Sequence, residues 1–514
     1  MGQFEIFTFL TLALAVCLLE WRIGFFICLI MGFLQDPIRK SIPEEPVYFT
    51  VLIGVFIAVT MVGAYARGVR LNFRAIHAWN PVLKLPLTLF ITLVVFSCMV
   101  TLATTGSFVI AGIGLLAYLT PLPAILLGYF FSRSQGDVLR AMKVYLLVAL
   151  LMTSGVYLSY AGYNWDILRS VGEGLIAYSP SGDELILYAG FLRSPEIAAW
   201  HAGTAICLLI LLSMVVKRQV TFTTIAGFLV MFFVGGLLLT GRRKFMAEIF
   251  LFVSLYGILV TRFRKGIGKH AFILMFGVAM GFVAYLYFTP DTFRAGLDSY
   301  YERGATVQED GTARVTLMTI DSFQLVIERN GFLGSGAGTG SQGAQHFGGG
   351  AELVGAAAEG GLAKVLAELG VPGLVLLIWL FISMGRYLWA IIMHVKEGDP
   401  VLAKLTYGMV TFLIANVMVY VIAHQVFGDL FVLVILGFFL GFILAIPRMQ
   451  EAPKPVEVRL SNVELLIRNS RAPMQPPQPI TGGEFRIANF EYRIARPQPG
   501  SVRQIQSSSD PEPK

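Results

Sequence analysis

The stretch DGTARVTLMTIDSFQLVIERNGFLGSGAGTGSQGAQHF (310–347), followed by EGGLAKVLAELGVPG (359–373), decides how the chain is organised. It belongs to the only long polar segment between apolar spans, Pro290–Gly373, and leads directly back into a hydrophobic helix. Long loops inside compact architectures are usually functional or disordered. Its apolar residues, such as Val315 and Met318, recur at helical spacing. We therefore expect a folded polar loop between membrane helices.

Apolar residues dominate the chain around this loop. Hydrophobic residues make up 56% and charged residues 14% of the 514 positions, and the mean hydropathy is +0.71. A soluble domain has about 25% charged residues. The apolar surplus falls in blocks of roughly 18–25 residues, the length that crosses about 30 Å of hydrocarbon. The sequence predicts an all-α polytopic membrane protein with about twelve transmembrane helices in residues 1–446.

The first apolar unit, Phe4–Leu34, is interrupted at Glu20, Trp21 and Arg22. It is either one membrane unit or a hairpin, which gives about twelve or thirteen spans in all. No basic n-region or cleavage site marks it as a signal peptide, so we expect it to be retained. A bend is expected at Pro121 and Pro123, inside one of the remaining spans. These spans are Val47–Tyr65, Pro86–Thr105, Phe108–Phe131, Met142–Gly162, Ile197–Val216, Phe222–Thr240, Phe245–Val260, Ala271–Phe288, Val365–Met384, Ala403–Ile422 and Phe427–Ile446.

Short basic loops predict the orientation of the spans, because cytoplasmic loops carry an excess of Lys and Arg. The net charge of +7 comes from such loops, so no nucleic-acid partner is indicated. The segments 163–196, 240–244 and 290–364 then fall on the external face. The segments assigned to the cytoplasm are 67–74, 133–143, 217–218, 262–269, 396–404 and 448–454.

Two further features bear on partners. The four cysteines, Cys17, Cys28, Cys98 and Cys207, lie within apolar spans and suggest neither a disulfide framework nor a metal site. The tail 447–514 is rich in Pro, Gln, Ser and Arg, a composition that favours disorder. Its alternating patch EFRIANFEYRI (484–494) could add as a strand to the sheet edge of a partner. We expect a flexible cytoplasmic tail.

Arginines at the external face are the first candidates for chemistry. Arg242 and Arg243 lie in LLLTGRRKFMA (237–247), at the external end of a span. Arg314 begins an amphipathic helix ahead of the glycine-rich stretch. Guanidinium groups bind phosphate bidentately and keep their charge, which indicates an anion site. Contact of these side chains with lipid headgroups is the alternative interpretation.

The glycine-rich run Gly331–Ser341 includes Gly336 and Gly338, whose backbone N–H groups could approach a diphosphate. A tight turn or flexible lid is the alternative. A dinucleotide-binding fold is excluded because no strand precedes the run within a βαβ unit. His346 and Glu359 are the candidate general bases. His201 and His424, at external span ends, are secondary candidates.

Four segments resemble the O-antigen ligase and O-antigen polymerase superfamily of integral membrane glycosyltransferases. GFLRSPEIAAW (190–200) is similar to its G-F-x-x-P-N-x-x-A segment, with Glu196 in place of Asn. Glu196 and Arg193, which lies in the same segment, are further secondary site candidates. LLLTGRRKFMA is similar to its T-x-S-R-G-A segment, in which Arg243 matches the family arginine. Residues 313–341 are similar to its R…P-L-x-G-x-G-x-G-x loop, in which Arg314 matches. In 359–373 the two final glycines match, whereas Glu359 occupies the place of the family histidine.

The resemblance implies a GT-C-like fold with a large catalytic loop, 290–364, outside a bacterial cytoplasmic (inner) membrane. It implies an undecaprenyl-diphosphate-linked glycan as donor. Arg242, Arg243 and Arg314 would neutralise the diphosphate leaving group. Glu359 or His346 would deprotonate the acceptor hydroxyl. No cofactor is expected, and no acidic pair with metal-ligand character stands out, so metal independence is expected.

Polymerase and ligase activity remain open on these motifs. We favour a polymerase for capsule, exopolysaccharide or O-antigen, whose tail contacts polysaccharide-assembly proteins. An O-antigen ligase or a protein O-oligosaccharyltransferase would use the same donor. A transporter of polysaccharide or lipid is the rival from another class, and it predicts charged residues within spans, broken helices and internal repeats.

Overall fold

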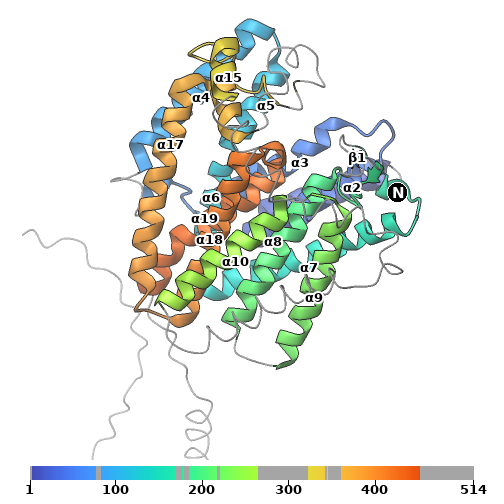
Figure 1. Cartoon of the computed structure of the whole chain (residues 1–514), viewed down its shortest axis with the longest axis vertical. Helices are drawn as coiled ribbons and strands as arrows, with labels where there is room; N and C mark the ends of the chain where they lie inside the picture. Colours follow the sequence, from blue (N-terminus) through green and yellow to red (C-terminus); the bar gives the residue numbers. More distant parts are fainter. Residues whose placement is uncertain are drawn as a thin grey trace, which may run out of the picture. The chain divides into compact units, whose positions relative to one another are not determined.

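The computed structural model describes residues 3–76, 83–169, 171, 176–178, 184–216, 220–242, 244–263, 322–341, 344 and 360–451. Within these ranges the regular secondary structure is helical apart from one short hairpin, and eleven helices are long and apolar enough to span a membrane (Figure 1). The prediction of a helical polytopic membrane protein is confirmed at this level. The expected span Ala271–Phe288, and most of the segments 290–364 and 447–514, lie outside the described residues.

The spanning segments are built from α2 (Trp21–Lys40), α3 (Leu52–Ala66), α4 (Lys84–Thr105), α5 (Phe108–Leu119), α6 (Pro121–Phe131), α7 (Gln135–Tyr160), α8 (Pro195–Val215), α9 (Val220–Leu239), α10 (Lys244–Phe263), α17 (Gly361–Val395), α18 (Pro400–Ile422) and α19 (Leu430–Glu451). The shorter elements are α1 (Gln3–Leu19), α15 (Ser322–Asn330), η1 (Val47–Val51), η2 (Phe73–Ala75), η4 (Asp166–Leu168) and η6 (Gln425–Gly428). Strands β1 (Ile176–Tyr178) and β2 (Glu184–Ile186) pair antiparallel, with Ile176 opposite Ile186.

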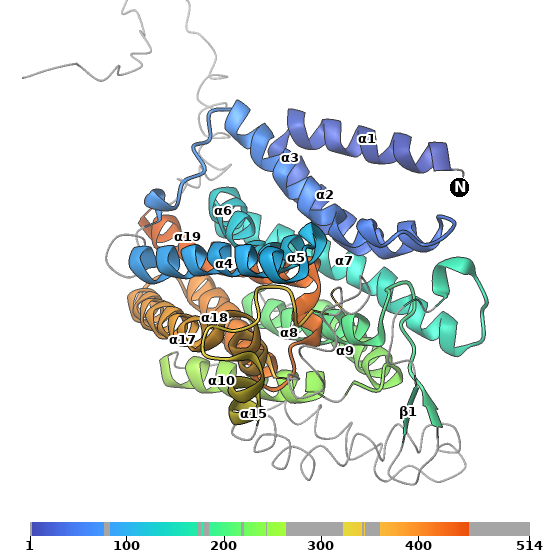
Figure 2. The same cartoon turned by 90° about the horizontal axis from the view of Figure 1, so that it is seen from above.

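The first apolar unit is divided into two helices, α1 and α2. The division falls at Glu20, whose φ of −133° and ψ of 79° are not helical. α1 packs against both α2 and α3 (Figure 2). The unit is therefore two helices, as the hairpin alternative for Phe4–Leu34 requires, although α1 has only 17 residues. The helix of Phe108–Phe131 is interrupted where the bend was expected, because α5 ends at Leu119 and α6 begins at Pro121, although Thr120 between them keeps a helical φ of −55° and ψ of −34°.

Helix α8 is the central helix of the bundle. In its most apolar window 94% of the residues are buried, more than in any other spanning helix of the described ranges. It packs against α7, α9, α10 and α18, which surround it in Figure 2. Because it is enclosed by protein, polar side chains on α8 contact other helices and not lipid. This placement matters for the polar residues at its first turns.

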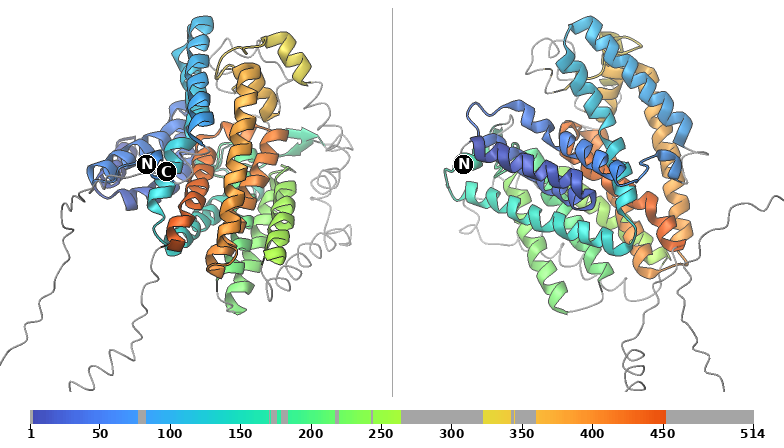
Figure 3. Two further views of the ribbon diagram at one scale, coloured as in Figure 1. Left: turned by 90° about the vertical axis from the view of Figure 1, so that its left-hand side faces the viewer. Right: turned by 180° about the vertical axis from the view of Figure 1, so that it is seen from behind.

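Contacts between helix ends sort the polar residues into two groups. At one end, Arg22 pairs with Asp137 at 3.1 Å, and Arg448 donates to the carbonyl oxygens of Tyr129 and Ser132. We call this the basic end, since the segments expected in the cytoplasm meet there. We call the opposite end, where α8, α10, α17 and α19 begin, the site end. Figure 3 shows α15 beside the site end of α17.

Candidate functional site

A buried charge cluster at the site end joins the segment before α8 to α2 and α19. Arg193 Nη2 lies 2.6 Å from Asp429 Oδ2, and Arg193 Nη1 lies 3.7 Å from Asp36 Oδ1. The backbone N–H of Arg193 also donates to Asp36 Oδ2 at 2.9 Å. We call Arg193, Asp36 and Asp429 the Arg193 cluster. Lys40, one turn beyond Asp36, donates to the carbonyl oxygen of Leu192 at 2.8 Å.

The two carboxylates stabilise the charged form of Arg193. Asp36 and Asp429 are each 2% exposed, so their charges require a partner inside the protein. Burial alone would lower the pKa of Arg193, but the neighbouring carboxylates of Asp429 and Asp36 outweigh burial and raise it. We therefore assign Arg193, a secondary candidate for substrate binding, to holding α2, α8 and α19 together.

A second cluster forms where α8 meets the α9–α10 junction. Glu196 Oε2 lies 3.4 Å from Arg242 Nε, and Glu196 also pairs with Lys244. Lys244 Nζ donates to Gln425 Oε1 in η6 at 3.0 Å. Burial lowers the pKa of Arg242, whose side chain is 25% exposed. These four residues, which we call the Glu196 cluster, place two cations around one carboxylate.

A hydrogen-bonded network lies one helical turn deeper. Trp200 Nε1 donates to Asn416 Oδ1 at 2.7 Å, and Asn416 Nδ2 donates to Glu248 Oε1 at 2.8 Å. The exposed fractions of these side chains are 0%, 2% and 1%. Trp200 and Glu248 follow Glu196 and Lys244 by four residues, so each pair lies on one face of its helix. The network therefore joins α8, α10 and α18 directly beneath the Glu196 cluster.

We expect Asn416→Leu to destabilise the protein by about 1–3 kcal/mol, because it leaves the indole N–H of Trp200 and the carboxyl of Glu248 without their partner. Glu248→Gln keeps an acceptor for Asn416 and should cost much less. Thermal unfolding of the purified protein in detergent measures both. An equal loss of stability in the two variants would show that the hydrogen bonds of Asn416 do not hold the three helices together.

His201 lies in the packed interior of α8. It lies within the first two turns of this helix, and its side chain is only 1% exposed, so it contacts other helices; a functional role for His201 stays a prediction. Its Nδ1 lies 2.8 Å from the hydroxyl oxygen of Tyr145, and its ring packs against Phe33 and Phe431. His424, the other secondary candidate, lies at the N-cap of η6, next to Gln425 of the Glu196 cluster.

Helix α17 is broken at Gly370, which has a φ of 68° and a ψ of −170°. Pro372 explains one part of the break, since it has no N–H to offer the carbonyl of Glu368 four residues earlier. Val371 turns its own N–H away from the helix and donates to Phe332 O at 2.9 Å. The break therefore leaves the carbonyl groups of Ala367 and Glu368 without helical partners.

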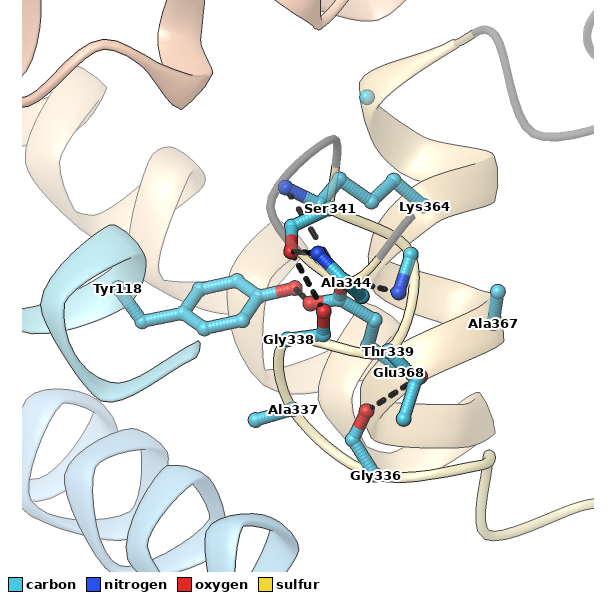
Figure 4. Close-up of polar contacts among 12 residues, drawn as sticks. Tyr118, Gly336, Ala337, Gly338, Thr339, Ser341, Ala344, Lys364, Ala367 and Glu368 are labelled. Carbon is cyan, nitrogen blue, oxygen red and sulfur yellow. Dashed lines mark hydrogen bonds and ion pairs between the residues drawn. The ribbon is translucent and has the colours of Figure 1, made fainter. Parts of the chain in front are cut away.

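The glycine-rich loop Gly331–Ser341 supplies the missing partners (Figure 4). Ser335 N donates to Ala367 O at 2.8 Å, and Gly336 N donates to Glu368 O at 3.0 Å. Buried carbonyl groups at membrane depth must be satisfied within the protein. The loop is thus a folded cap over the broken helix, which favours the tight-turn interpretation of this run.

The carboxylate of Glu368 lies inside this cap and is fully buried (Figure 4). Its Oε2 accepts the Tyr118 hydroxyl at 2.6 Å, and its Oε1 accepts the Gly340 N–H at 3.0 Å. Lys364 Nζ lies 3.9 Å from Oε1. A protein carboxylate therefore occupies the concave side of the loop, where the sequence suggested a phosphate.

Gly336 and Gly338 have a packing role in the structure. A Cβ at Gly336 would collide with Thr101 of α4, and one at Gly338 would collide with Gly114 and Ile110 of α5. Their absent side chains allow the loop to lie directly on these helices. Binding of a diphosphate by the two glycines stays a prediction.

The two site-end regions meet at the end of α18. Tyr420 donates its hydroxyl to Gly361 O at 3.1 Å, at the start of α17. Gln425, which follows α18, accepts from Lys244 of the Glu196 cluster at 3.0 Å. The segments 190–200, 237–247, 331–341 and 359–373 are widely separated in sequence. In the structure the described residues of these segments gather around the site end of α18 and the first residues after it.

The principal predicted catalytic residues, Arg243, Arg314, His346 and Glu359, lie outside the described residues. Of the remaining site candidates, Arg242 and Glu196 are brought together, whereas Arg193 and His201 face other partners. No group of three or more His, Cys, Asp or Glu residues that could hold a metal ion occurs within the described ranges. Metal independence stays a prediction.

The sequence interpretation missed several polar residues of the site end, namely Asp36, Lys40, Tyr118, Asn416 and Asp429. A signal for them existed, because charged or amide side chains within or at the ends of apolar spans usually face other helices and pair there. The partners of each could not be read from the sequence, since every contact joins segments distant along the chain.

Comparison of the chain with known proteins identifies no family. No protein-family model matches the chain, and no curated protein matches it significantly.

Proposed function

We propose that the protein is an integral membrane glycosyltransferase that polymerises undecaprenyl-diphosphate-linked oligosaccharide repeat units at the outer face of a bacterial inner membrane. The observation that supports this proposal is the gathering of the described parts of the four segments of the resemblance around the site end of α18. Two cationic side chains of the Glu196 cluster, Arg242 and Lys244, lie there together with the start of helix α17. A lipid-linked anion would approach from the membrane boundary to the same place.

In the proposed reaction, a hydroxyl oxygen of the acceptor glycan attacks the anomeric carbon of the donor. The bond between that carbon and the diphosphate oxygen breaks, and undecaprenyl diphosphate leaves with the bonding electrons. Arg243 and Arg314, with Arg242, hold the diphosphate and stabilise its charge. Glu359 or His346 takes the proton of the acceptor hydroxyl. The GT-C-like fold and the external position of the site end belong to this proposal.

A transporter is the second candidate, because two observations favour it. Helix α17 is broken at Gly370, and Glu248 and Glu368 are buried within spanning helices. Broken helices and intramembrane carboxylates are common at transport sites. However, the break is capped by the glycine-rich loop, and the Glu368 carboxylate already has partners. An O-antigen ligase or protein O-oligosaccharyltransferase remains a variant of the first proposal with another acceptor.

The test is to incubate the purified protein with an undecaprenyl-diphosphate-linked oligosaccharide and to follow glycan chain length on a gel. The wild type should give a ladder, and Arg243→Ala and Arg314→Ala should each lower the rate at least about 100-fold, because each removes a group that stabilises leaving-group charge. Arg67→Ala, at an exposed ion pair of the basic end, is the matched control and should retain activity.

Further variants and acceptors separate the alternatives. A ladder that survives Glu359→Gln assigns the base to His346, whereas its loss assigns it to Glu359. Donor turnover only with a lipid-core or protein acceptor identifies the ligase or oligosaccharyltransferase. If the donor stays intact with every acceptor, the transferase proposal is rejected and the transporter is favoured.

A further inference from the structure

A solvent-exposed cavity of about 480 Å³ lies at the site end, apart from the two clusters described above. Its lining consists of Ser41, Asn164, Trp165, Asp166 and Ile167. Ser41 is the C-cap residue of α2, and the other four belong to the segment that leads from α7 into η4. Ligand pockets of small molecules have volumes of roughly 300–1,000 Å³. The cavity is therefore large enough for a sugar ring with its substituents.

The segment that lines the cavity is held in place. Leu168 is buried against the bundle, and its N–H donates to Trp165 O at 2.8 Å. Arg169 pairs with Glu45 across the gap between η4 and the segment after α2. The ring of Tyr163 lies 5.6 Å from that of Trp165, centroid to centroid. The walls are thus a preorganised surface, which reduces the entropy lost on binding.

The chemistry of the lining selects the class of ligand. Trp165 is 50% exposed and presents a broad aromatic surface beside polar groups. Within the described part of the chain, the amide of Asn164, the carboxylate of Asp166 and the indole N–H of Trp165 have no hydrogen-bond partner. An aromatic face next to unused donors and acceptors suits a pyranose, whose C–H groups lie on the electron-rich face while its hydroxyls bond at the edge.

The charge of the lining also suits a sugar. The lining contains one carboxylate, Asp166, and no cation. A neutral sugar hydroxyl can donate to this carboxylate. Tyr and Trp at this level could also form part of an aromatic belt in the headgroup region. The placement of Asn164 and Asp166 beside Trp165 in one cavity favours a binding surface over such a belt.

The cavity is linked to the segment before α8 through the end of α2. Ser41 directly follows Lys40, whose Nζ donates to the carbonyl groups of Gly190 and Leu192. These carbonyl groups immediately precede Arg193. A sugar held against Trp165 thus lies beside the segment that leads into α8 and the Glu196 cluster.

We propose that this cavity is a subsite for a sugar residue of the glycan chain, held by stacking on Trp165 and by hydrogen bonds to Asn164 and Asp166. The proposal rests on the proposed glycosyltransferase function for its biological role, but not for the binding itself. The lipid diphosphate binds elsewhere. The subsite therefore holds sugars of the glycan chain, and the reacting bond lies nearer the Glu196 cluster.

The first experiment measures binding without catalysis. The probe is the oligosaccharide released from the lipid-linked donor by mild acid, added to the purified full-length protein in detergent and followed by saturation-transfer NMR. Trp165→Ala should weaken binding at least 10-fold, and Trp165→Phe, which keeps an aromatic face, less than threefold. Asp166→Asn should weaken it several-fold. The matched control is Trp389→Ala, since Trp389 is 52% exposed on α17 and does not line the cavity.

The second experiment uses the polymerisation assay. Trp165→Ala should raise the KM for the acceptor glycan at least 10-fold and change kcat less than twofold, because the subsite does not touch the reacting bond. If Trp165→Ala loses sugar binding and the wild type turns over no donor, the subsite is supported and the glycosyltransferase proposal is rejected. Turnover by the wild type, with equal sugar binding by wild type and Trp165→Ala, would overturn the subsite and identify Trp165 as part of the aromatic belt.

Discussion

Arg193→Ala should lower the free energy of unfolding by about 3–5 kcal/mol, because it leaves two buried carboxylates without their cation. Arg193 Nη2 lies 2.6 Å from Asp429 Oδ2, and its backbone N–H holds Asp36 at 2.9 Å. After the substitution, only the hydrogen bond from the backbone N–H of residue 193 to Asp36 remains. The ends of α2 and α19 then carry unpaired charges in the interior, where nothing else among the described residues takes the place of the guanidinium beside Asp429.

The measurement is denaturation of the purified protein in mixed detergent micelles, with Arg67→Ala as the control. Arg67 pairs with Glu20 where both side chains are 53% exposed, and an exposed pair contributes about 1 kcal/mol or less. A triple variant, Arg193→Met with Asp36→Asn and Asp429→Asn, should recover part of the loss since no charge is left unpaired. Equal stability of Arg193→Ala and Arg67→Ala would contradict the structural role and return Arg193 to the substrate-binding candidates.

The helical framework could be predicted from the sequence because membrane helices are determined by local composition. Each span needs a long apolar block, and such blocks are visible without knowledge of neighbours. The bend at Pro121 was predictable for the same reason, since proline acts on its own helix. The division of the first unit was open because Glu20 interrupts it without a proline or glycine. Its resolution depends on packing against α3.

The site was less predictable because its contacts join distant segments. The pairing of Glu196 with Arg242 and Lys244 requires the start of α8 to meet the α9–α10 junction. The same holds for Glu368, which the sequence placed near a span end without its partner Tyr118 from α5. The glycine-rich run was ambiguous, since glycines permit close approach to a phosphate and to a neighbouring helix equally well. The structure shows the second use at Gly336 and Gly338.

Gly370→Ala should destabilise the protein by about 3 kcal/mol or more and detach the glycine-rich loop from α17. Gly370 has a φ of 68° and a ψ of −170°, a region that is essentially restricted to glycine and costs about 1–3 kcal/mol for other residues. An added Cβ would also collide with the carbonyl oxygen of Phe332 and the backbone of Leu333. Relief requires the loop to move, which breaks the Val371 N–H bond to Phe332 and weakens the contacts of Ser335 with Ala367.

Limited proteolysis with trypsin at Arg329, followed by mass spectrometry, reports on this loop, and thermal unfolding reports on the whole protein. Arg329 lies in the last turn of α15, which ends at Asn330 immediately before the loop, so Gly370→Ala should be cut faster than wild type. Gly385→Ala is the matched control, because Gly385 lies in the same helix and a Cβ there meets nothing within 4 Å. In a helix interior that substitution is stabilising by roughly 0.5–1 kcal/mol. If Gly370→Ala is cut at the wild-type rate and unfolds at the control temperature, the break in α17 is not held by the loop, and the buried carboxylate of Glu368 must be secured by Tyr118 and Lys364 alone.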